Sequence, residues 1–195
     1  MLGFQQKRRP RQSFRLALKL GRKSIEIPSA AMFPPYYYIG LPDLSEEAYT
    51  YAKKYDERIK KTGRLNLFNS HNVGYLCWQA GKYKEAEDYF YQQIKYSEES
   101  IKLEKPESQS RKTHQSCLAQ TYAFIGDKSK CYQYLDEVSR LKVNPRFRIT
   151  LFKNTPFFAG IRTEERFQKI IQNMEENYQA EHDKVRKWLE KNNML

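Results

Sequence analysis

The sequence predicts an all-α protein, built from stacked antiparallel helical hairpins and closed by a long C-terminal helix. Three observations favour this fold class. A glycine-centred pattern recurs after 45 residues, 15 Tyr and 11 Phe carry much of the apolar content, and the 195 residues include only 8 Gly and 8 Pro. So few turn formers leave little room for the many tight turns of a β-sandwich or β-barrel. A run of about 18 apolar residues is missing, so no transmembrane helix is expected.

The first 31 residues form a basic arm that differs from the rest of the chain. Of the formal charge of +12, residues 1–25 carry +8, and the remaining residues are nearly balanced. A short amphipathic basic helix here would suit nucleic acid or an anionic membrane. A solvated leader, a remnant of a preceding repeat helix and an organellar transit segment stay open as alternatives. The basic residues are Lys7, Arg8, Arg9, Arg11, Arg15, Lys19, Arg22 and Lys23.

The remaining residues, 32–195, are predicted to form one helical repeat domain, whose clearest hairpin spans 67–104. Apolar residues follow 3.6-residue spacing on both sides of Gly81. Gly81 is expected to end the first helix, because glycine adopts the positive φ of such a corner without penalty. Small residues at Gly74 and Ala86 should let the two helices approach closely, and Phe90 is the large apolar residue of the pattern.

A second hairpin is predicted over 110–145, because the same pattern returns there at an offset of 45 residues. Gly126 aligns with the first corner glycine, and small or large apolar residues align at the neighbouring positions. The matching residues of the second hairpin are Ala119, Cys131 and Leu135. Each hairpin would leave one apolar face unburied, so stacking of neighbours is the expected route to stability.

Weaker signals flank these two hairpins. Upstream, a partial repeat is predicted over 34–63, with a helix starting near Ser45. Downstream, capping helices are predicted over 154–191: a short one with Pro156 at its first position and a long one capped by Thr163. The long helix is expected to face the array with the stripe Phe167, Ile170, Ile171, Met174, Tyr178, Val185, Trp188 and Leu189.

These hairpins resemble the tetratricopeptide repeat family, whose pattern is a small residue, a turn glycine, an aromatic residue, Ala and a large apolar residue. The first hairpin matches at Gly74, Gly81, Tyr83, Ala86 and Phe90, and the second at Leu118, Ala119, Tyr122, Gly126, Leu135 and Pro145. The family period is about 34 residues. The longer offset predicts that 97–111 holds the excess as longer helices and a wider loop. The resemblance implies a helical solenoid that binds proteins.

The ending, from Pro156 to Leu189, resembles the last part of tetratricopeptide arrays attached to bacterial signalling proteins such as kinases, nucleotide cyclases and transcription regulators. The resemblance implies a docking or sensing tail. In the family, first helices line an inner groove, and the aromatic and amide side chains carried over by motif suit an extended peptide or a helix. These residues are Phe68, His71, Tyr75, Trp78, Gln79, Ser116, Gln120 and Phe124. For Tyr75 and Trp78, internal packing is an equal alternative.

No catalytic residue, cofactor or metal site is predicted. The three His are not spaced as ligands on one helical face, and the chain has no glycine-rich phosphate loop and no nucleophile elbow. An odd number of Cys without a Cys-x-x-Cys motif indicates buried free thiols in a reducing cytoplasm. We therefore expect a non-catalytic protein-interaction scaffold of a bacterial signalling or regulatory system. Binding of nucleic acid or anionic membrane through the basic arm is the alternative.

Overall fold

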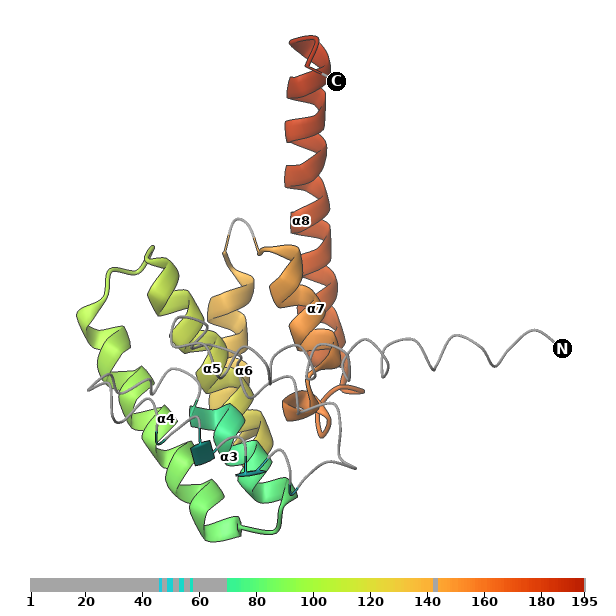
Figure 1. The fold of residues 1–195 in the computed structure, drawn as a ribbon. Coiled ribbons are helices and arrows are strands. Elements are labelled where there is room, and N and C mark those ends of the chain that lie inside the picture. The colour runs from blue at the N-terminus through green and yellow to red at the C-terminus, as the bar shows by residue number, and fades with distance from the viewer. Residues whose placement is uncertain are drawn as a thin grey trace, which may run out of the picture. The chain divides into compact units, whose positions relative to one another are not determined.

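The computed structural model describes residues 46, 49, 50, 53, 54, 57, 70–141 and 144–194. Within these ranges every regular element is a helix and no strand occurs, which confirms the predicted all-α class (Figure 1). The chain divides into two compact units, residues 1–92 and 93–195, each of which is described by itself. The predicted stacking of the hairpins into a solenoid therefore stays a prediction.

The first unit contains the predicted glycine corner between α3 (Ser70–Gln79) and α4 (Tyr83–Leu103). Gly81 has φ +73°, which confirms the positive φ expected of it. Its N–H donates to the Trp78 carbonyl at 3.0 Å, and the Lys82 N–H donates to the Cys77 carbonyl at 2.9 Å. These two bonds form a Schellman motif, which satisfies carbonyls that the end of α3 would otherwise leave unpaired.

The small residues of this hairpin allow the close approach that the sequence predicts. A Cβ added to Gly74 would lie 2.9 Å from Cε1 of Phe90 and 3.1 Å from the Ala86 carbonyl oxygen. Ala86 and Phe90 are themselves buried, with 1% and 5% of their surface exposed. The backbone of α3 therefore rests directly on the first turns of α4, where a larger residue would push the helices apart.

The second unit repeats the corner between α5 (Gln109–Ile125) and α6 (Lys128–Ser139). Gly126 has φ +89°, and its N–H donates to the Ala123 carbonyl at 3.3 Å. Asp127 follows at once and caps α6, because its Oδ1 accepts from the Lys130 N–H at 3.0 Å. The core of this unit includes the matching residues Leu118, Ala119, Cys131 and Leu135.

The extra length of the 45-residue offset lies where the sequence predicts it. α4 has 21 residues and runs on to Leu103, and α5 begins only at Gln109. Ser108 caps α5, since its Oγ accepts from the Arg111 N–H at 3.0 Å. A longer second helix and a loop with its own cap therefore separate the two hairpins along the chain.

The C-terminal region contains one helix that the sequence analysis missed, α7 (Arg146–Asn154). It begins directly after Pro145, a residue that favours helix starts, and it buries Ile149 and Phe152. The 3-10 helix η4 (Pro156–Phe158) follows and carries Pro156 first, as predicted. Thr155 occupies its N-cap position but makes no side-chain cap bond.

The long helix α8 (Glu165–Lys191) confirms the predicted terminal helix, with a correction at its start. Its N-cap is Glu164, not Thr163, and Glu164 makes no side-chain cap bond. The Glu164 carboxylate instead accepts from Lys128 Nζ at 2.7 Å and from the Tyr132 hydroxyl at 2.6 Å. The start of α8 is therefore fixed by contacts to α6.

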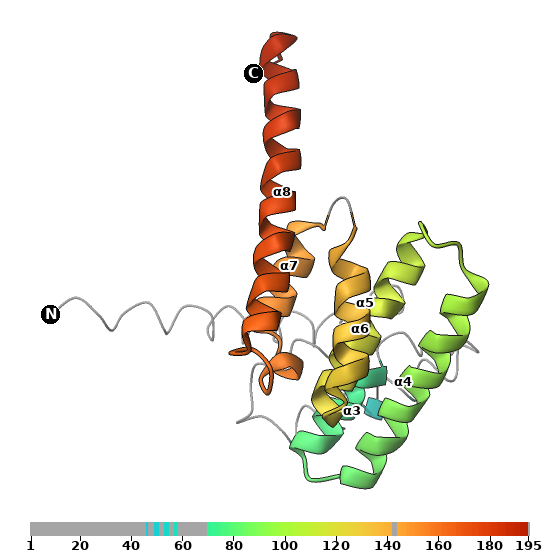
Figure 2. The ribbon, with the colours of Figure 1, turned by 180° about the vertical axis from the view of Figure 1, so that it is seen from behind.

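The core of the second unit lies among α5, α6, α7 and the first half of α8. Phe158 is at its centre, with its ring centroid 5.1 Å from that of Phe152 and 5.2 Å from that of Phe167. The predicted stripe of α8 is buried only as far as Met174, whereas Val185 and Trp188 are 58% and 57% exposed. The expectation that the whole stripe faces the array is therefore wrong for its second half, which extends past α7 (Figure 2).

Several expectations fall on residues outside the described part. The basic arm, residues 1–31, lies there entirely, and so does most of the partial repeat at 34–63. Within that partial repeat, the described residues are all helical: Glu46, Tyr49, Thr50, Lys53, Lys54 and Glu57. A search of the described helices for one long and apolar enough to cross a bilayer finds none.

Candidate functional site

A pair of exposed aromatic rings lies at the corner between α3 and α4 in the first unit. Trp78, in the last turn of α3, is 45% exposed, and Tyr83, which opens α4, is 60% exposed. The Trp78 ring stacks on buried Tyr75 at a centroid distance of 6.1 Å and meets the edge of Tyr83 at 6.4 Å. The ring of Trp78 thus has the internal packing that the sequence left open as one alternative, and part of it remains exposed. We call Trp78 and Tyr83 the aromatic corner.

A polar contact lies near the aromatic corner on α4. The Glu85 carboxylate accepts from Lys53 Nζ at 2.9 Å and from the Tyr49 hydroxyl at 3.1 Å. These contacts hold the pKa of Glu85 below its usual value, mainly through the hydrogen bond from Lys53, and they raise the pKa of Lys53. Because Lys53 and Glu85 are both partly exposed, the pair contributes little to stability. It ties the helical residues near 50 to α4.

The other groove residues predicted in the first unit are less accessible. His71 and Tyr75 are only 2% and 7% exposed, and Gln79 is half-buried. Phe68 lies outside the described residues. The expectation that His71 lines an open surface is therefore wrong, and Tyr75 has the internal packing that the sequence left open as an alternative. Hydrophobic spacing identifies the face of a helix but not how much chain covers it, and α3 is buried all round from Ser70 to Cys77.

The groove residues predicted in the second unit are also largely interior. Ser116 and Gln120 are each 5% exposed. Ser116 Oγ donates to the Lys112 carbonyl at 2.9 Å, and Gln120 Nε2 donates to the Ser116 carbonyl at 3.2 Å. Such bonds to the preceding turn satisfy polar side chains locally and permit their burial. Phe124 is half-buried, with its ring edge-to-face against Phe157 at 5.6 Å. Ser116 and Gln120 therefore do not form the expected binding surface.

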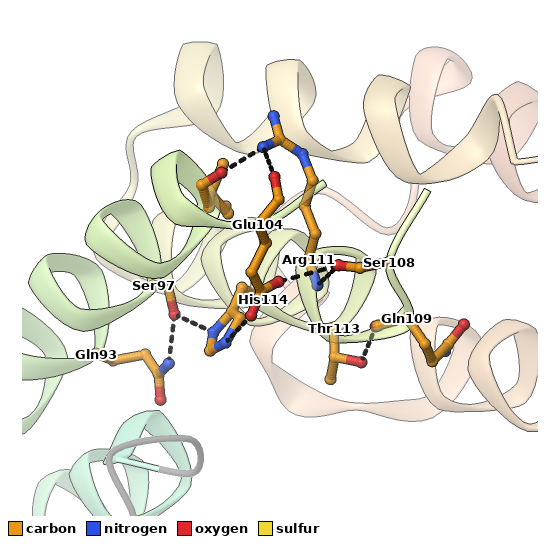
Figure 3. Close-up of polar contacts among 9 residues, drawn as sticks. Gln93, Ser97, Glu104, Ser108, Gln109, Arg111, Thr113 and His114 are labelled. Atoms are coloured by element: carbon orange, nitrogen blue, oxygen red, sulfur yellow. Dashed lines mark hydrogen bonds and ion pairs between the residues drawn. The ribbon is translucent and has the colours of Figure 1, made fainter. Parts of the chain in front are cut away.

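A buried polar cluster, which the sequence analysis missed, joins α4 to α5 in the second unit (Figure 3). Gln93 Nε2 donates to Ser97 Oγ at 2.8 Å, and Ser97 Oγ lies 3.3 Å from Nδ1 of His114. All three side chains are at most 2% exposed. The signal in the sequence was the one-turn spacing of Gln93 and Ser97 along the apolar stripe of α4. Polar residues at core positions of a helix predict a buried hydrogen-bonded partner.

The outer rim of this cluster closes the α4–α5 connection. Glu104 Oε1 lies 3.8 Å from Nε2 of His114, and Ser108 Oγ donates to Glu104 Oε2 at 3.2 Å. The Arg111 guanidinium donates to the carbonyls of Ile101 and Glu104 at the end of α4. Figure 3 shows these side chains converging from both helices on one polar region.

A serine, a histidine and a carboxylate together invite comparison with a hydrolase triad, but the geometry favours structure. Ser97 is 0% exposed, so its Oγ presents no surface to a substrate. The contact between Glu104 and His114 is longer than a hydrogen bond. Burial lowers the pKa of His114, an effect that Glu104 partly opposes, so the imidazole is neutral at neutral pH. A neutral imidazole next to a hydroxyl suits a satisfied buried network.

All three cysteines lie in the described part of the chain, where they are buried thiols outside any disulfide, as predicted. Burial raises the pKa of Cys117 and of Cys131 to about 12. Since the thiolate is the nucleophile and the metal ligand, thiols with such pKa values are inert at neutral pH. Among the described residues, no group of His, Cys, Asp and Glu is arranged to hold a metal ion.

No family model, curated protein or solved structure matches the chain. The likeness to tetratricopeptide repeats therefore rests on the residues named above.

Proposed function

We propose that the chain is a non-catalytic protein-interaction scaffold that binds a peptide or helix of a partner protein. The aromatic corner carries this proposal, because Trp78 and Tyr83 together offer a large exposed aromatic surface. Tryptophan and tyrosine are the residues in which interface binding energy concentrates, since they bury much area at a low cost in side-chain entropy.

The surroundings of Trp78 favour an anchor that is already ordered before binding. Tyr75 supports its ring from behind, and the Schellman bonds at Gly81 fix the backbone of the corner. Ordering that is complete in the free protein does not subtract from affinity. Neighbouring Gln79 has a buried Oε1 without a hydrogen-bond partner among the described residues. A change of rotamer on binding would give this oxygen a donor from the partner backbone.

The proposed setting is a docking or sensing tail of a bacterial signalling or regulatory system. It rests on the likeness of the ending to arrays attached to such proteins. The non-catalytic part of the proposal is supported by the burial of Ser97 and His114 and by the raised pKa of the thiols of Cys117 and Cys131.

Site-specific photo-crosslinking tests the aromatic corner. A photoreactive phenylalanine analogue replaces Tyr83 in one variant and Tyr91, which is 67% exposed on the same helix, in the other. In cells of the source organism, we expect a discrete crosslinked partner from position 83, lost when Trp78→Ala is added, and none from position 91. Equal crosslinking at both positions would refute the corner as the site. Catalytic turnover by the purified chain would refute the non-catalytic proposal.

The basic arm supports a second candidate, a nucleic-acid or anionic-membrane binder. Its charge of +8 within 25 residues, with no acid before Glu26, is the observation behind it. Phosphate contacts release counterions, so such binding falls steeply with salt. Retention on DNA and on anionic vesicles, compared between the full chain and a chain starting at Met32 across a salt series, tests it. Equal retention of both chains would exclude the basic arm as the site that binds nucleic acid or membrane.

A further inference from the structure

The second half of α8 exposes an apolar stripe that continues the buried one. Phe167, Ile171 and Met174 recur every three or four residues and are buried in the second unit. Val185 and Trp188 continue the same spacing but are 58% and 57% exposed. Residues at this spacing share one face of a helix. Figures 1 and 2 both show this half of α8 extending beyond α7, so within the described part of the chain its apolar face lacks the cover that the first half has.

Charge is distributed unevenly along the exposed half. Glu181 and Asp183 come first, and four bases follow with a single acid among them. The exposed half is thus negative near the body of the unit and positive near its tip. Lys184 pairs with Glu181 and Arg186 with Glu190, both within the helix and exposed to solvent. Exposed pairs of this kind are weak, so they can exchange partners at small cost.

An open hollow lies at the foot of the exposed stripe. It has a volume of about 470 Å³ and is lined by α7 and α8. Its apolar lining comes from Ile149 and Tyr178, and Tyr178 also belongs to the stripe of α8. The other end of the exposed half carries Met194, which is 61% exposed. The exposed half therefore has an apolar group at its tip and, at its base, a largely polar hollow to which Ile149 and Tyr178 contribute apolar surface.

We propose that the exposed half of α8 pairs antiparallel with the same half of a second copy of this chain. With the two-fold axis between Arg186 and Lys187, Val185 of each copy meets Trp188 of the other. In the same register Glu181 lies across from Asn192 of the second copy and next to its Lys191, and the Met194 tip reaches the hollow beside Tyr178. A parallel pair would instead place Glu181 beside Glu181. Charge order along the helix therefore selects the antiparallel arrangement, and the contact is self-complementary as a two-fold interface requires.

Sedimentation equilibrium of the full chain, with a charge-swap pair, tests this inference. We expect a monomer–dimer equilibrium for the unaltered chain. Glu181→Lys would bring two ammonium groups together across the interface, and Lys191→Glu would bring two carboxylates together, so each variant alone should dimerise more weakly. An equimolar mixture should restore association as a heterodimer, because both cross-pairs then have opposite charges. The matched controls, Asp183→Lys and Lys187→Glu, lie on the opposite face of α8 and should leave dimerisation unchanged.

Trp188→Ala provides an independent measurement. It removes the largest exposed apolar group of the stripe, so the dimer dissociation constant should rise about tenfold or more, as for a hot-spot tryptophan. Helical circular dichroism should not change, because Trp188 is outside the buried core. A chain that stays monomeric up to its solubility limit, or a mixture of the charge variants that does not recover, overturns the proposal. Binding of a monomeric chain to anionic vesicles that Trp188→Ala abolishes also overturns it and assigns the face to a membrane.

Discussion

Gly74 of α3 lies so close to Phe90 of α4 that one methyl group would not fit between them: an added Cβ would be 2.9 Å from Cε1 of Phe90. We therefore expect Gly74→Ala to lower the free energy of unfolding by about 1–2 kcal/mol, because overpacking outweighs the gain in helix propensity. Urea titration followed by circular dichroism measures it. Gly160→Ala is the control, since a Cβ there meets nothing within 4 Å. Equal free energies of unfolding for the two variants would mean that α3 and α4 can move apart to fit the added methyl group without loss of stability.

The corner at Gly126 depends on backbone conformation rather than on space. Its φ is +89°, and an added Cβ would have no neighbour within 4 Å. Gly126→Ala should therefore lower the free energy of unfolding by about 1–2 kcal/mol, solely because alanine is strained in the left-handed conformation. Gly126→Asn should cost less, because asparagine tolerates positive φ better than alanine. Urea titrations of both variants check this order, and a reversed order would contradict the conformational explanation.

His114 should make the stability of the second unit depend on pH. Burial lowers the folded-state pKa of His114 below its usual value near 6.5, so the unfolded chain binds this proton more readily. The contribution of neutral His114 to the free energy of unfolding is fully present above about pH 6.5. It is lost as the pH falls towards the lowered pKa. Of the groups around the imidazole, Ser97 and the Tyr96 ring do not oppose this loss, and Glu104 only reduces it.

The measurement is the free energy of unfolding of the unaltered chain and of His114→Gln from about pH 5 to about pH 7.5, a range that brackets the usual histidine pKa. The difference between the two profiles should shrink as the pH falls, since the variant has no imidazole to protonate. The same substitution at His182, which is exposed on α8, is the control for loss of an imidazole outside the buried cluster. Parallel profiles for the unaltered chain and His114→Gln would show that the burial of His114 has no effect on stability.

The two halves of the α8 stripe should respond differently to truncation. Met174 is 0% exposed and Val185 is 58% exposed, although both belong to one stripe. Met174→Ala should lower the free energy of unfolding by about 2–5 kcal/mol, as other truncations of buried side chains do. Val185→Ala should stay within about 0.5 kcal/mol when measured at concentrations where the chain is monomeric. Thermal unfolding of dilute samples tests this, and similar losses for both variants would indicate that the second half is packed within the monomer.

The hairpin corners were predictable because glycine has a distinct physical role at a helix end. Gly81 and Gly126 both adopt the positive φ expected of them, and the small Gly74 meets its expected neighbour. In these places a single residue type decides the local backbone. The long helix α8 was predictable for a related reason, since its apolar period continues well past Met174.

The groove was not predictable in the same way. Ser116 and Gln120 look like surface residues, yet their side chains are satisfied by carbonyls of their own helix and are buried. Composition cannot distinguish this local bonding from exposure to solvent. α7 was missed because five of its nine residues are polar or charged, and among its apolar residues only Ile149 and Phe152 are buried. The buried Ser97–His114 contact joins two helices, so the spacing of Gln93 and Ser97 within α4 indicates a buried partner but does not identify His114.

Arg111 ends α4 in a manner unlike the two glycine corners. The carbonyls of Ile101 and Glu104 accept hydrogen bonds from the Arg111 guanidinium, which belongs to the following helix. At the other two corners, a glycine with positive φ ends the helix instead. The α4–α5 junction is therefore held by a removable side chain rather than by a backbone conformation. Lysine at this position would offer a single ammonium in place of the planar fork. One substitution can therefore alter the connection between α4 and α5 while both glycine corners remain intact.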